Sequence, residues 1–252
     1  MIRSSEYFRY DGRNSDDFNI LNVNITSGMV EESFMASREI KTTEIRGRVE
    51  PYFQEVRLEP FSFSLELGYD GTFTETDLKE IRMWLSQPYY KELIFSDELD
   101  QKYFAILNSD IKITHTTNNQ GYISCEFLCN SPYKYSPVMI KEYYVTTPSI
   151  DLEIFNNGDI ICYPKITFKT YNSGSYTIIN QTDGGTAFTF TTLADDETIQ
   201  VWNKEKRITT DLADTYRYSN FNQNWLRLLV GKNVLSLNSA GYIKIEYEEM
   251  YL

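Results

Sequence analysis

The stretch Ile150–Lys169, IDLEIFNNGDIICYPKITFK, divides the sequence into two modules. Runs rich in β-branched and aromatic residues lie on both sides of the sequence NNGD at 156–159, which is typical of a turn. This pattern predicts two short strands joined by a turn. The segment upstream, Ser131–Ser149, contains three prolines and is predicted to be a linker. We therefore expect one domain over residues 1–138 and a second over residues 139–252.

Upstream of the linker, several short runs alternate apolar and polar residues. The clearest run follows Pro60 and has apolar side chains at every second position, namely Phe61, Phe63, Leu65 and Leu67. Alternation of this kind is the period of a half-buried strand. The chain also contains 20 Tyr and 15 Phe, residues that favour strands. The first module is therefore predicted to be a β-sandwich.

Two cysteines, Cys125 and Cys129, lie four residues apart in another such run. On a strand they would share one face at a separation of roughly 13 Å, which is too far for a disulfide. We expect both to be small core residues rather than redox or metal-binding groups.

One helix is predicted, near residues 77–86. Leu78, Ile81 and Leu85 recur at helical spacing and form an apolar stripe. Thr76 is the expected N-cap, and Pro88 follows the expected end. The stripe indicates packing against the sandwich rather than a binding site.

Residues 30–54 have a different composition. The sequence VEESFMASREIKTTEIRGRVEPYF (30–53) is polar, with isolated apolar residues that cannot build a core of their own. One interpretation is a solvated loop or an edge hairpin. The other is an extended arm whose partners lie on another subunit. The candidate inter-subunit residues on the second interpretation are Arg38, Ile40, Ile45, Arg46 and Arg48.

Downstream of Ile150 the chain alternates short strand-like runs with turn signals such as Asp183-Gly184-Gly185. This spacing is typical of an antiparallel β-sandwich. The expected strands are Ile150–Phe155, Ile160–Phe168, Tyr176–Asn180, Ala187–Thr191, Thr198–Trp202, Leu226–Val230, Val234–Leu237 and Tyr242–Tyr247. The last of these can complete the second sandwich or return to the first domain.

No residue pattern indicates catalysis, a metal site or a cofactor. The single histidine, His115, excludes a His-rich zinc site and is expected to be packed or hydrogen-bonded. Nucleophile-elbow, zinc-protease and nucleotide-binding motifs are missing from the sequence. A net charge of −12 disfavours stable binding of nucleic acid. No apolar run reaches the ~20 residues of a membrane span, and the N-terminus lacks an apolar signal core, so we expect synthesis in the cytoplasm and no membrane contact.

Landmarks along nearly the whole chain occur in the order typical of one protein family. They are FRYDGRNSDDFNI (8–20), the DGT and TETDL block within 70–90, LIFSDELDQKYFAIL (93–107), FLCNSPYKYSP (127–137), NNGDIICYPKITF (156–168) and YIKIEYEEMYL (242–252). In this order they resemble the distal tail proteins of long-tailed, siphovirus-type phages that infect Gram-positive bacteria.

The resemblance implies a fold and a function. The first domain would be a sandwich with a helix, and six copies would close into a ring partly through an extended hairpin, which gives the polar arm a role. The second domain would be galectin-like, although residues 140–252 lack the histidine of the galectin sugar-binding signature. The implied protein is a structural hub of the virion, without enzymatic activity. It would join the tail tube to tail-associated and receptor-binding proteins and let DNA pass.

Two other functions remain open on the sequence. The second domain could be a glycan- or receptor-binding module of the tail tip. A cell-wall hydrolase is the more remote alternative, because paired carboxylates that are adjacent in sequence do not by themselves face a cleft.

Overall fold

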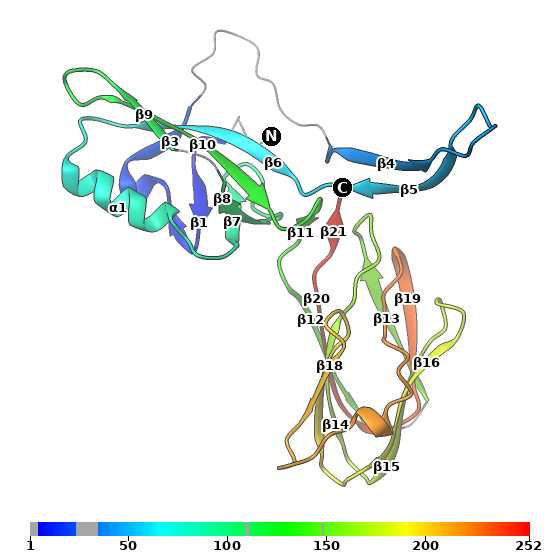
Figure 1. Cartoon of the computed structure of the whole chain (residues 1–252). Helices are drawn as coiled ribbons and strands as arrows, with labels where there is room; N and C mark the ends of the chain where they lie inside the picture. Colours follow the sequence, from blue (N-terminus) through cyan, green and yellow to red (C-terminus); the bar gives the residue numbers. More distant parts are fainter. Residues whose placement is uncertain (1–4, 24–34, 109–110, 148) are drawn as a thin grey trace. The chain divides into compact units, whose positions relative to one another are not determined.

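The computed structural model describes residues 5–23, 35–108, 111–147 and 149–252 (Figure 1). These residues form two compact units, the first within residues 1–135 and the second within residues 136–251. The fold is mainly β, as predicted, with one α-helix among the described residues.

The first unit contains one eight-stranded antiparallel sheet, ordered β2-β1-β7-β8-β10-β6-β3, with β9 also paired to β10. Its strands are β1 (Phe8–Tyr10), β2 (Arg13–Asn14), β3 (Ile20–Asn22), β6 (Ser62–Tyr69), β7 (Lys91–Phe95), β8 (Tyr103–Leu107), β9 (Lys112–His115) and β10 (Gly121–Cys129). Asp11 and Gly12, both with positive φ, close the hairpin of β1 and β2, as tight hairpin turns require. A 3-10 helix, η2 (Asp16–Phe18), precedes β3.

This sheet curls around an aromatic core. Tyr10 on β1 meets Phe127 on β10 edge to face at 5.3 Å, although two strands separate β1 from β10 in the sheet. The helix α1 (Glu75–Leu85) contributes Trp84, whose ring stacks on Phe18 at 4.3 Å and whose Nε1 donates to the Tyr10 carbonyl at 2.8 Å. Cys125 and Cys129 are buried in the same core, as predicted.

The helix begins two residues earlier than expected. Thr74, not Thr76, is the N-cap: its hydroxyl accepts from the Asp77 amide, while the Asp77 carboxylate accepts from the Thr74 amide at 2.7 Å. This reciprocal arrangement is a capping box with Asp at its third position. The same Thr74 groups lower the pKa of Asp77. The predicted cap at Thr76 is wrong because Thr76 is already inside the first helical turn.

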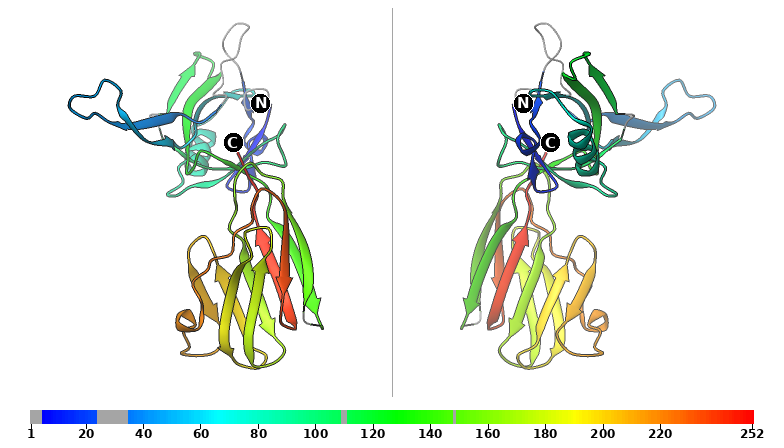
Figure 2. Two further views of the ribbon diagram at one scale, coloured as in Figure 1. Left: turned by 90° about the vertical axis from the view of Figure 1, so that its right-hand side faces the viewer. Right: turned by 90° about the vertical axis from the view of Figure 1, so that its left-hand side faces the viewer.

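The second unit packs two antiparallel sheets face to face around a separate core. Figure 1 shows the two sheets as adjacent layers, and Figure 2 shows their strands side by side. The five-stranded sheet is ordered β12-β20-β14-β17-β18 and the four-stranded sheet β13-β19-β15-β16. The strands of the five-stranded sheet are β12 (Met139–Val145), β14 (Lys165–Thr170), β17 (Thr198–Trp202), β18 (Arg207–Thr210) and β20 (Gly241–Tyr247). Those of the four-stranded sheet are β13 (Ile150–Asn156), β15 (Gly174–Asn180), β16 (Thr186–Leu193) and β19 (Gly231–Leu237).

The last long strand, β20, pairs with β12 and β14 and so belongs to the second unit. Shorter elements are β11 (Lys134–Tyr135), η3 (Tyr218–Asn220) and β21 (Met250–Tyr251).

Two predictions about this part of the chain are wrong. Ser131–Ser149 is not simply a linker, because it contains the seven-residue strand β12, whose alternate residues Met139 and Tyr143 pack on the core. Leu226–Val230 is not a strand and makes a single bridge, from Leu228 to Cys162. Two of its amides bond to asparagine side chains instead of a neighbouring strand: Leu226 donates to Asn203 Oδ1 and Leu229 to Asn233 Oδ1.

Candidate assembly surface

The predicted arm contains a hairpin that forms its own two-stranded sheet. Strands β4 (Arg38–Thr43) and β5 (Tyr52–Leu58) pair only with each other among the described residues. The first part of the predicted arm, residues 30–34, lies outside the residues that the structure describes. An isolated two-stranded hairpin is marginally stable in water. Such a hairpin is expected to gain stability from contact with a partner, and we therefore treat it as the candidate functional surface.

Pairing between the strands gives the hairpin two unlike faces. Arg38 is paired with Leu58, Ile40 with Val56, and Thr42 with Phe53, and paired residues lie on one face of a sheet. We call Ile40, Phe53, Val56 and Leu58 the apolar face of the arm. The opposite face carries Glu39, Lys41, Thr43, Tyr52, Glu55 and Arg57.

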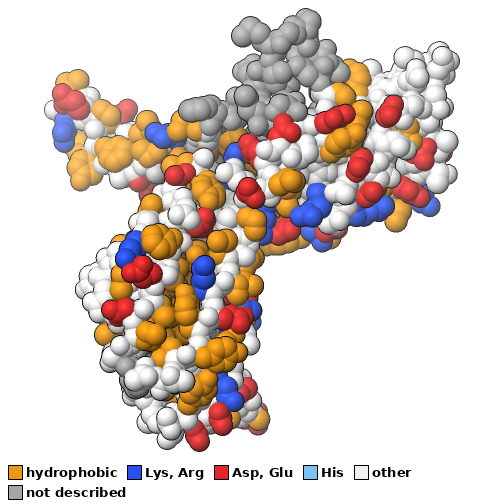
Figure 3. All heavy atoms as spheres, turned by 180° about the vertical axis from the view of Figure 1, so that it is seen from behind, with side chains coloured by type: hydrophobic (Ala, Val, Ile, Leu, Met, Phe, Trp, Pro, Cys, Tyr) orange, Lys and Arg blue, Asp and Glu red, His pale blue; other side chains and the backbone are white. Residues whose placement is uncertain are grey.

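Three of the four residues of the apolar face are exposed, and the fourth, Leu58, is partly buried. Ile40 is 64% exposed, Phe53 57% and Val56 46%. Figure 3 shows hydrophobic side chains along the projecting hairpin. Single exposed apolar residues are ordinary on protein surfaces, but a contiguous row marks an interaction site.

The opposite face is held by polar contacts within the hairpin. Lys41 Nζ lies 2.9 Å from Glu55 Oε1, and this partner lowers the pKa of the Glu55 carboxyl. Gln54 Nε2 donates to Thr43 Oγ1. The side chains in both contacts are accessible to solvent, so each contact contributes little to stability. The charged face is therefore suited to solvent and the apolar face to a partner.

The five predicted residues divide between the strand and the tip of the hairpin. Arg38 and Ile40 share one face of β4, whereas Ile45, Arg46 and Arg48 lie in the connection between the strands. All five are exposed. The Arg48 amide donates to the Ile45 carbonyl at 3.0 Å, which brings these two residues together at the tip. A role for any of them between subunits stays a prediction.

Sequence reasoning missed Phe53, Val56 and Leu58 as partners of Ile40. The register shifts between Lys41 and Thr42 because Gln54 is an extra residue on β5. Such a bulge places Phe53 and Val56 on one face although they are three positions apart. The usual period of two therefore does not reveal the row.

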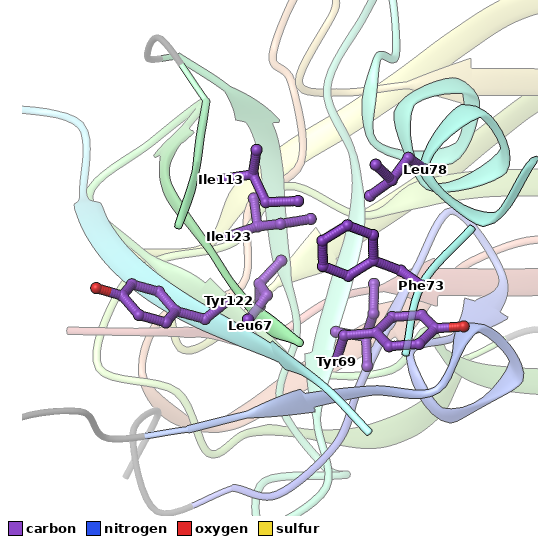
Figure 4. A pocket seen from close by; sticks show the side chains of 9 residues that line it. Leu67, Tyr69, Phe73, Leu78, Ile113, Tyr122 and Ile123 are labelled. Carbon is purple, nitrogen blue, oxygen red and sulfur yellow. The ribbon is translucent and has the colours of Figure 1, made fainter. Parts of the chain in front are cut away.

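The first unit also has a small apolar notch between the β9–β10 hairpin and α1 (Figure 4). Its lining includes Leu67, Phe73, Leu78, Ile113 and Ile123, and its exposed wall is apolar throughout. The space holds about 10 Å³, which is roughly one water molecule or one methyl group. The notch is too small and too apolar for a nucleotide or a sugar.

The histidine and the cysteines, which are the side chains with the most catalytic potential, occupy structural positions. His115 is exposed, with Nδ1 3.0 Å from the Thr116 carbonyl and its ring against the edge of Phe73. The three cysteines are buried and unpaired, and burial raises the pKa of each thiol to about 12. Within the described ranges, no group of three or more His, Cys, Asp or Glu could hold a metal ion. The same ranges contain no helix that is long and apolar enough to cross a membrane.

Two family models together match nearly the whole chain. Residues 3–131 match a phage tail protein N-terminal domain, and residues 133–247 match a phage tail C-terminal domain. The chain therefore belongs to this family of phage tail proteins, whose members are structural components and not enzymes. The predicted resemblance to phage tail proteins is confirmed.

A sequence relative and two solved structures agree with this assignment. The SPbeta prophage-derived uncharacterized protein YomH of Bacillus subtilis (strain 168) is 32% identical over 253 residues, which is 100% of both chains. The fold is similar to that of SPP1 Dit (gp 19.1), described as a paradigm of the hub adsorption apparatus in phages that infect Gram-positive bacteria. The TM-score is 0.73 at 20% identity, over 98% of this chain and 99% of that one. A chain of the phage P2 baseplate in its Ca-activated conformation matches with a TM-score of 0.54 at 9% identity, over 96% and 97% of the two chains.

Proposed function

We propose that this protein is a hub of the phage tail tip and that its first unit closes into a ring. In this ring, the arm of each copy docks on the next copy. The observation that carries the proposal is the apolar face of the arm, on which Ile40, Phe53 and Val56 are exposed beside the partly buried Leu58. The fold shared with SPP1 Dit, itself described as part of a hub, supports the same role. Six copies is the number that the family resemblance implies.

The energetics of the arm favour a contact between subunits. Full burial of a Val, Ile, Leu or Phe side chain contributes roughly 1.5–3 kcal/mol, and the three most exposed residues of the face are about half covered or less. Docking therefore contributes on the order of 1 kcal/mol for each residue. The contact repeats around the ring, so a modest free energy in each copy is multiplied.

The proposed ring joins the tail tube to the tail-associated and receptor-binding proteins and leaves a passage for DNA. Its acidic composition, with a net charge of −12, suits a passage because it repels phosphate. The protein would be assembled in the host cytoplasm and carried in the virion at the distal end of the tail.

The oligomeric state of the full chain tests the ring. Native mass spectrometry and negative-stain imaging should show a species of six times the 29.6 kDa chain mass, alone or with the tail tube protein. Ile40→Asp with Val56→Asp places two carboxylates on the apolar face and should abolish that species. Thr43→Asp adds a carboxylate on the opposite face and is the matched control. A ring that survives the paired change, or monomers under every condition including added tube protein, would contradict the proposal.

A second candidate function is glycan or receptor binding by the second unit. Its favouring observation is a pair of tyrosines on adjacent strands: the rings of Tyr144 and Tyr242 lie 5.1 Å apart, and Tyr144 is 72% exposed. Amphipathic rings of this kind suit recognition surfaces. Binding of the full chain to host cell walls that is lost in Tyr144→Ala would support this function. Equal binding by the two proteins would remove the tyrosine pair as its site.

A further inference from the structure

The sheet edges of the second unit differ in how well they are protected against pairing with another chain. Strands β12 and β18 are the edges of the five-stranded sheet, and β13 and β16 are those of the four-stranded sheet. An edge strand presents unpaired backbone amides and carbonyls, so it is a template for a further strand unless the chain blocks it. The protection of each edge therefore indicates where pairing is prevented and where it is permitted.

Edges β16 and β18 are covered by η3 and the residues that follow it. The side chains of Asn222 and Asn224 both donate to the Ala187 carbonyl on β16, at 2.8 and 3.0 Å. The Tyr218 hydroxyl accepts from the Ile208 amide of β18 at 3.1 Å. These contacts occupy backbone groups that a further strand would need.

Edge β12 is blocked by a charge on its inner face. Lys141 is paired with Ile245 of β20, whose side chain is fully buried, so Lys141 belongs to the core face of β12. Its neighbours on that face, Met139 and Tyr143, pack on the core, whereas Lys141 is exposed. A lysine in this position prevents pairing because a further strand would bury its ammonium group.

Edge β13 lacks such protection over its first five residues. It lies beside β19 (Figure 1), and its other edge has no strand partner among the described residues. Its core face carries Ile150, Leu152 and Ile154 and no charge. Only the end of the strand is covered, where the Tyr247 hydroxyl donates to the Phe155 carbonyl at 2.9 Å. We call Ile150–Ile154 the open edge.

The outer face of the open edge is acidic. Asp151 and Glu153 alternate with the core residues, and both are exposed. Glu153 Oε1 lies 2.6 Å from Lys232 Nζ, and the Ser236 hydroxyl donates to Asp151. Both partners come from β19, so the side of each carboxylate that faces away from β19 is available to a further strand.

These charges argue against a second copy of β13 as the partner. Antiparallel self-pairing centred on Leu152 uses the whole open edge and places Asp151 opposite Glu153. Self-pairing centred on Glu153 uses the whole strand and places that carboxylate opposite its own copy. Like charges directly opposite one another are destabilising, whereas opposite charges stabilise the pair. A segment with basic side chains at these positions is the better complement.

We propose that the open edge of β13 receives an extended segment of a different protein, which adds a strand to the four-stranded sheet. The segment has apolar side chains opposite the core residues of the open edge and Lys or Arg opposite Asp151 and Glu153. In strand addition of this kind, backbone hydrogen bonds give the affinity and alternate side chains give the specificity. The inference concerns the second unit and does not depend on the proposed ring.

A synthetic peptide tests the charge preference of the open edge in the full chain. The probe is the fluorescently labelled peptide Thr-Val-Lys-Val-Lys-Val-Thr with blocked ends, whose sequence reads the same in both directions. By fluorescence anisotropy it should bind roughly tenfold more tightly than the same peptide with Glu in place of Lys. In Asp151→Asn with Glu153→Gln this preference should fall to near one. Thermal unfolding should change little, because both side chains are exposed.

Methylation of the peptide backbone separates strand addition from simple attraction between charges. One version of the probe carries N-methyl groups on its Val residues, and the other carries them on its Thr and Lys residues. Alternate amides of a strand face its neighbour, so one version should bind and the other should not. Equal binding of the two versions would overturn the inference, because charge attraction does not depend on which amides are methylated.

Hydrogen exchange of the full chain locates the bound peptide. The probe should slow amide exchange within Ile150–Ile154 and leave exchange in β12 unchanged, since Lys141 blocks that edge. No slowing at the open edge with excess probe, or equal slowing in β12, would overturn the inference. Slow exchange that is present without the probe and is lost on dilution of the chain would assign the edge to a second copy, and would overturn the choice of partner.

Discussion

Removing the arginine of the buried ion pair in the second unit should be strongly destabilising. Glu197 has a fully buried side chain, and Arg217 holds it with two hydrogen bonds of 2.8 and 2.7 Å. The Thr210 hydroxyl and the Ala194 amide also donate to this carboxylate. Arg217→Met keeps most of the side-chain bulk and leaves the carboxylate without its cation. Breaking one side of a buried pair costs about 3–5 kcal/mol.

The assay is thermal unfolding followed by calorimetry. For a unit of this size, the loss should lower the transition temperature by on the order of 10–20 °C. Lys232→Met removes the cation of the Lys232–Glu153 pair in the same unit, in which both side chains are about half exposed. That control should cost at most about 1 kcal/mol.

The dependence on pH distinguishes the ion pair from simple packing. In the native protein burial raises the pKa of Glu197, but the bonds from Arg217, Thr210 and Ala194 outweigh it, so the pKa lies below its ordinary value of 4.5. The pair therefore stabilises the fold fully above pH 4.5, and the contribution is lost as the pH falls through the lowered folded pKa.

In Arg217→Met, the effect of burial on the pKa of Glu197 should outweigh that of the remaining hydrogen bonds. Without the guanidinium, burial should raise the pKa of Glu197 above 4.5, so protonation relieves the penalty as the pH falls. The loss of unfolding free energy relative to wild type should be largest near pH 7.5 and should shrink towards pH 5. Adding Glu197→Gln to Arg217→Met should recover part of the loss and remove its pH dependence. A deficit that is constant with pH, or no larger than that of Lys232→Met, would refute the reasoning.

Three further predictions concern the helix and the cysteines. Thr74→Ala should cost about 1 kcal/mol by urea unfolding because it removes the capping box, whereas Thr76→Ala should be close to neutral. Trp84→Phe should cost about 1–3 kcal/mol in the same assay, because it leaves the buried Tyr10 carbonyl without its donor; a value near zero would show that water replaces the indole. The native thiols should resist a maleimide at pH 8 and all react after denaturation, since burial raises each pKa to about 12 and suppresses the thiolate; fast labelling of the folded chain would contradict this placement.

The sequence was sufficient for the elements whose patterns are local. Phe63, Leu65 and Leu67 alternate with polar residues, and Leu78, Ile81 and Leu85 recur at helical spacing, so the strand and the helix could be predicted. The start of the helix is harder to predict, because three threonine or aspartate positions in TETD can cap and only the packed geometry selects Thr74.

Elements that depend on distant partners were harder to predict. The sequence predicts a linker at β12 because the adjacent charged residues Lys141 and Glu142 interrupt its apolar residues and prolines lie on both sides. Its status as a strand comes from pairing with β20, about a hundred residues away. In the arm, the sequence showed Ile40 and Ile45 as isolated apolar residues. The face that Ile40 shares with Phe53 and Val56 exists only in the register of the bulged hairpin.

The arm differs from the rest of the described chain in how its sequence matches its structure. In the main sheets of both units the alternation of residues agrees with burial, as in β10 and β20, where every second side chain is inside. In the β4–β5 hairpin an equally ordered apolar face meets solvent. Agreement between pattern and burial is what makes a fold specific, and places where it fails are commonly functional sites. The hairpin has no packed core of its own to explain its apolar face. An uncovered face on a regular hairpin is therefore better explained by a partner than by the folding of a single chain.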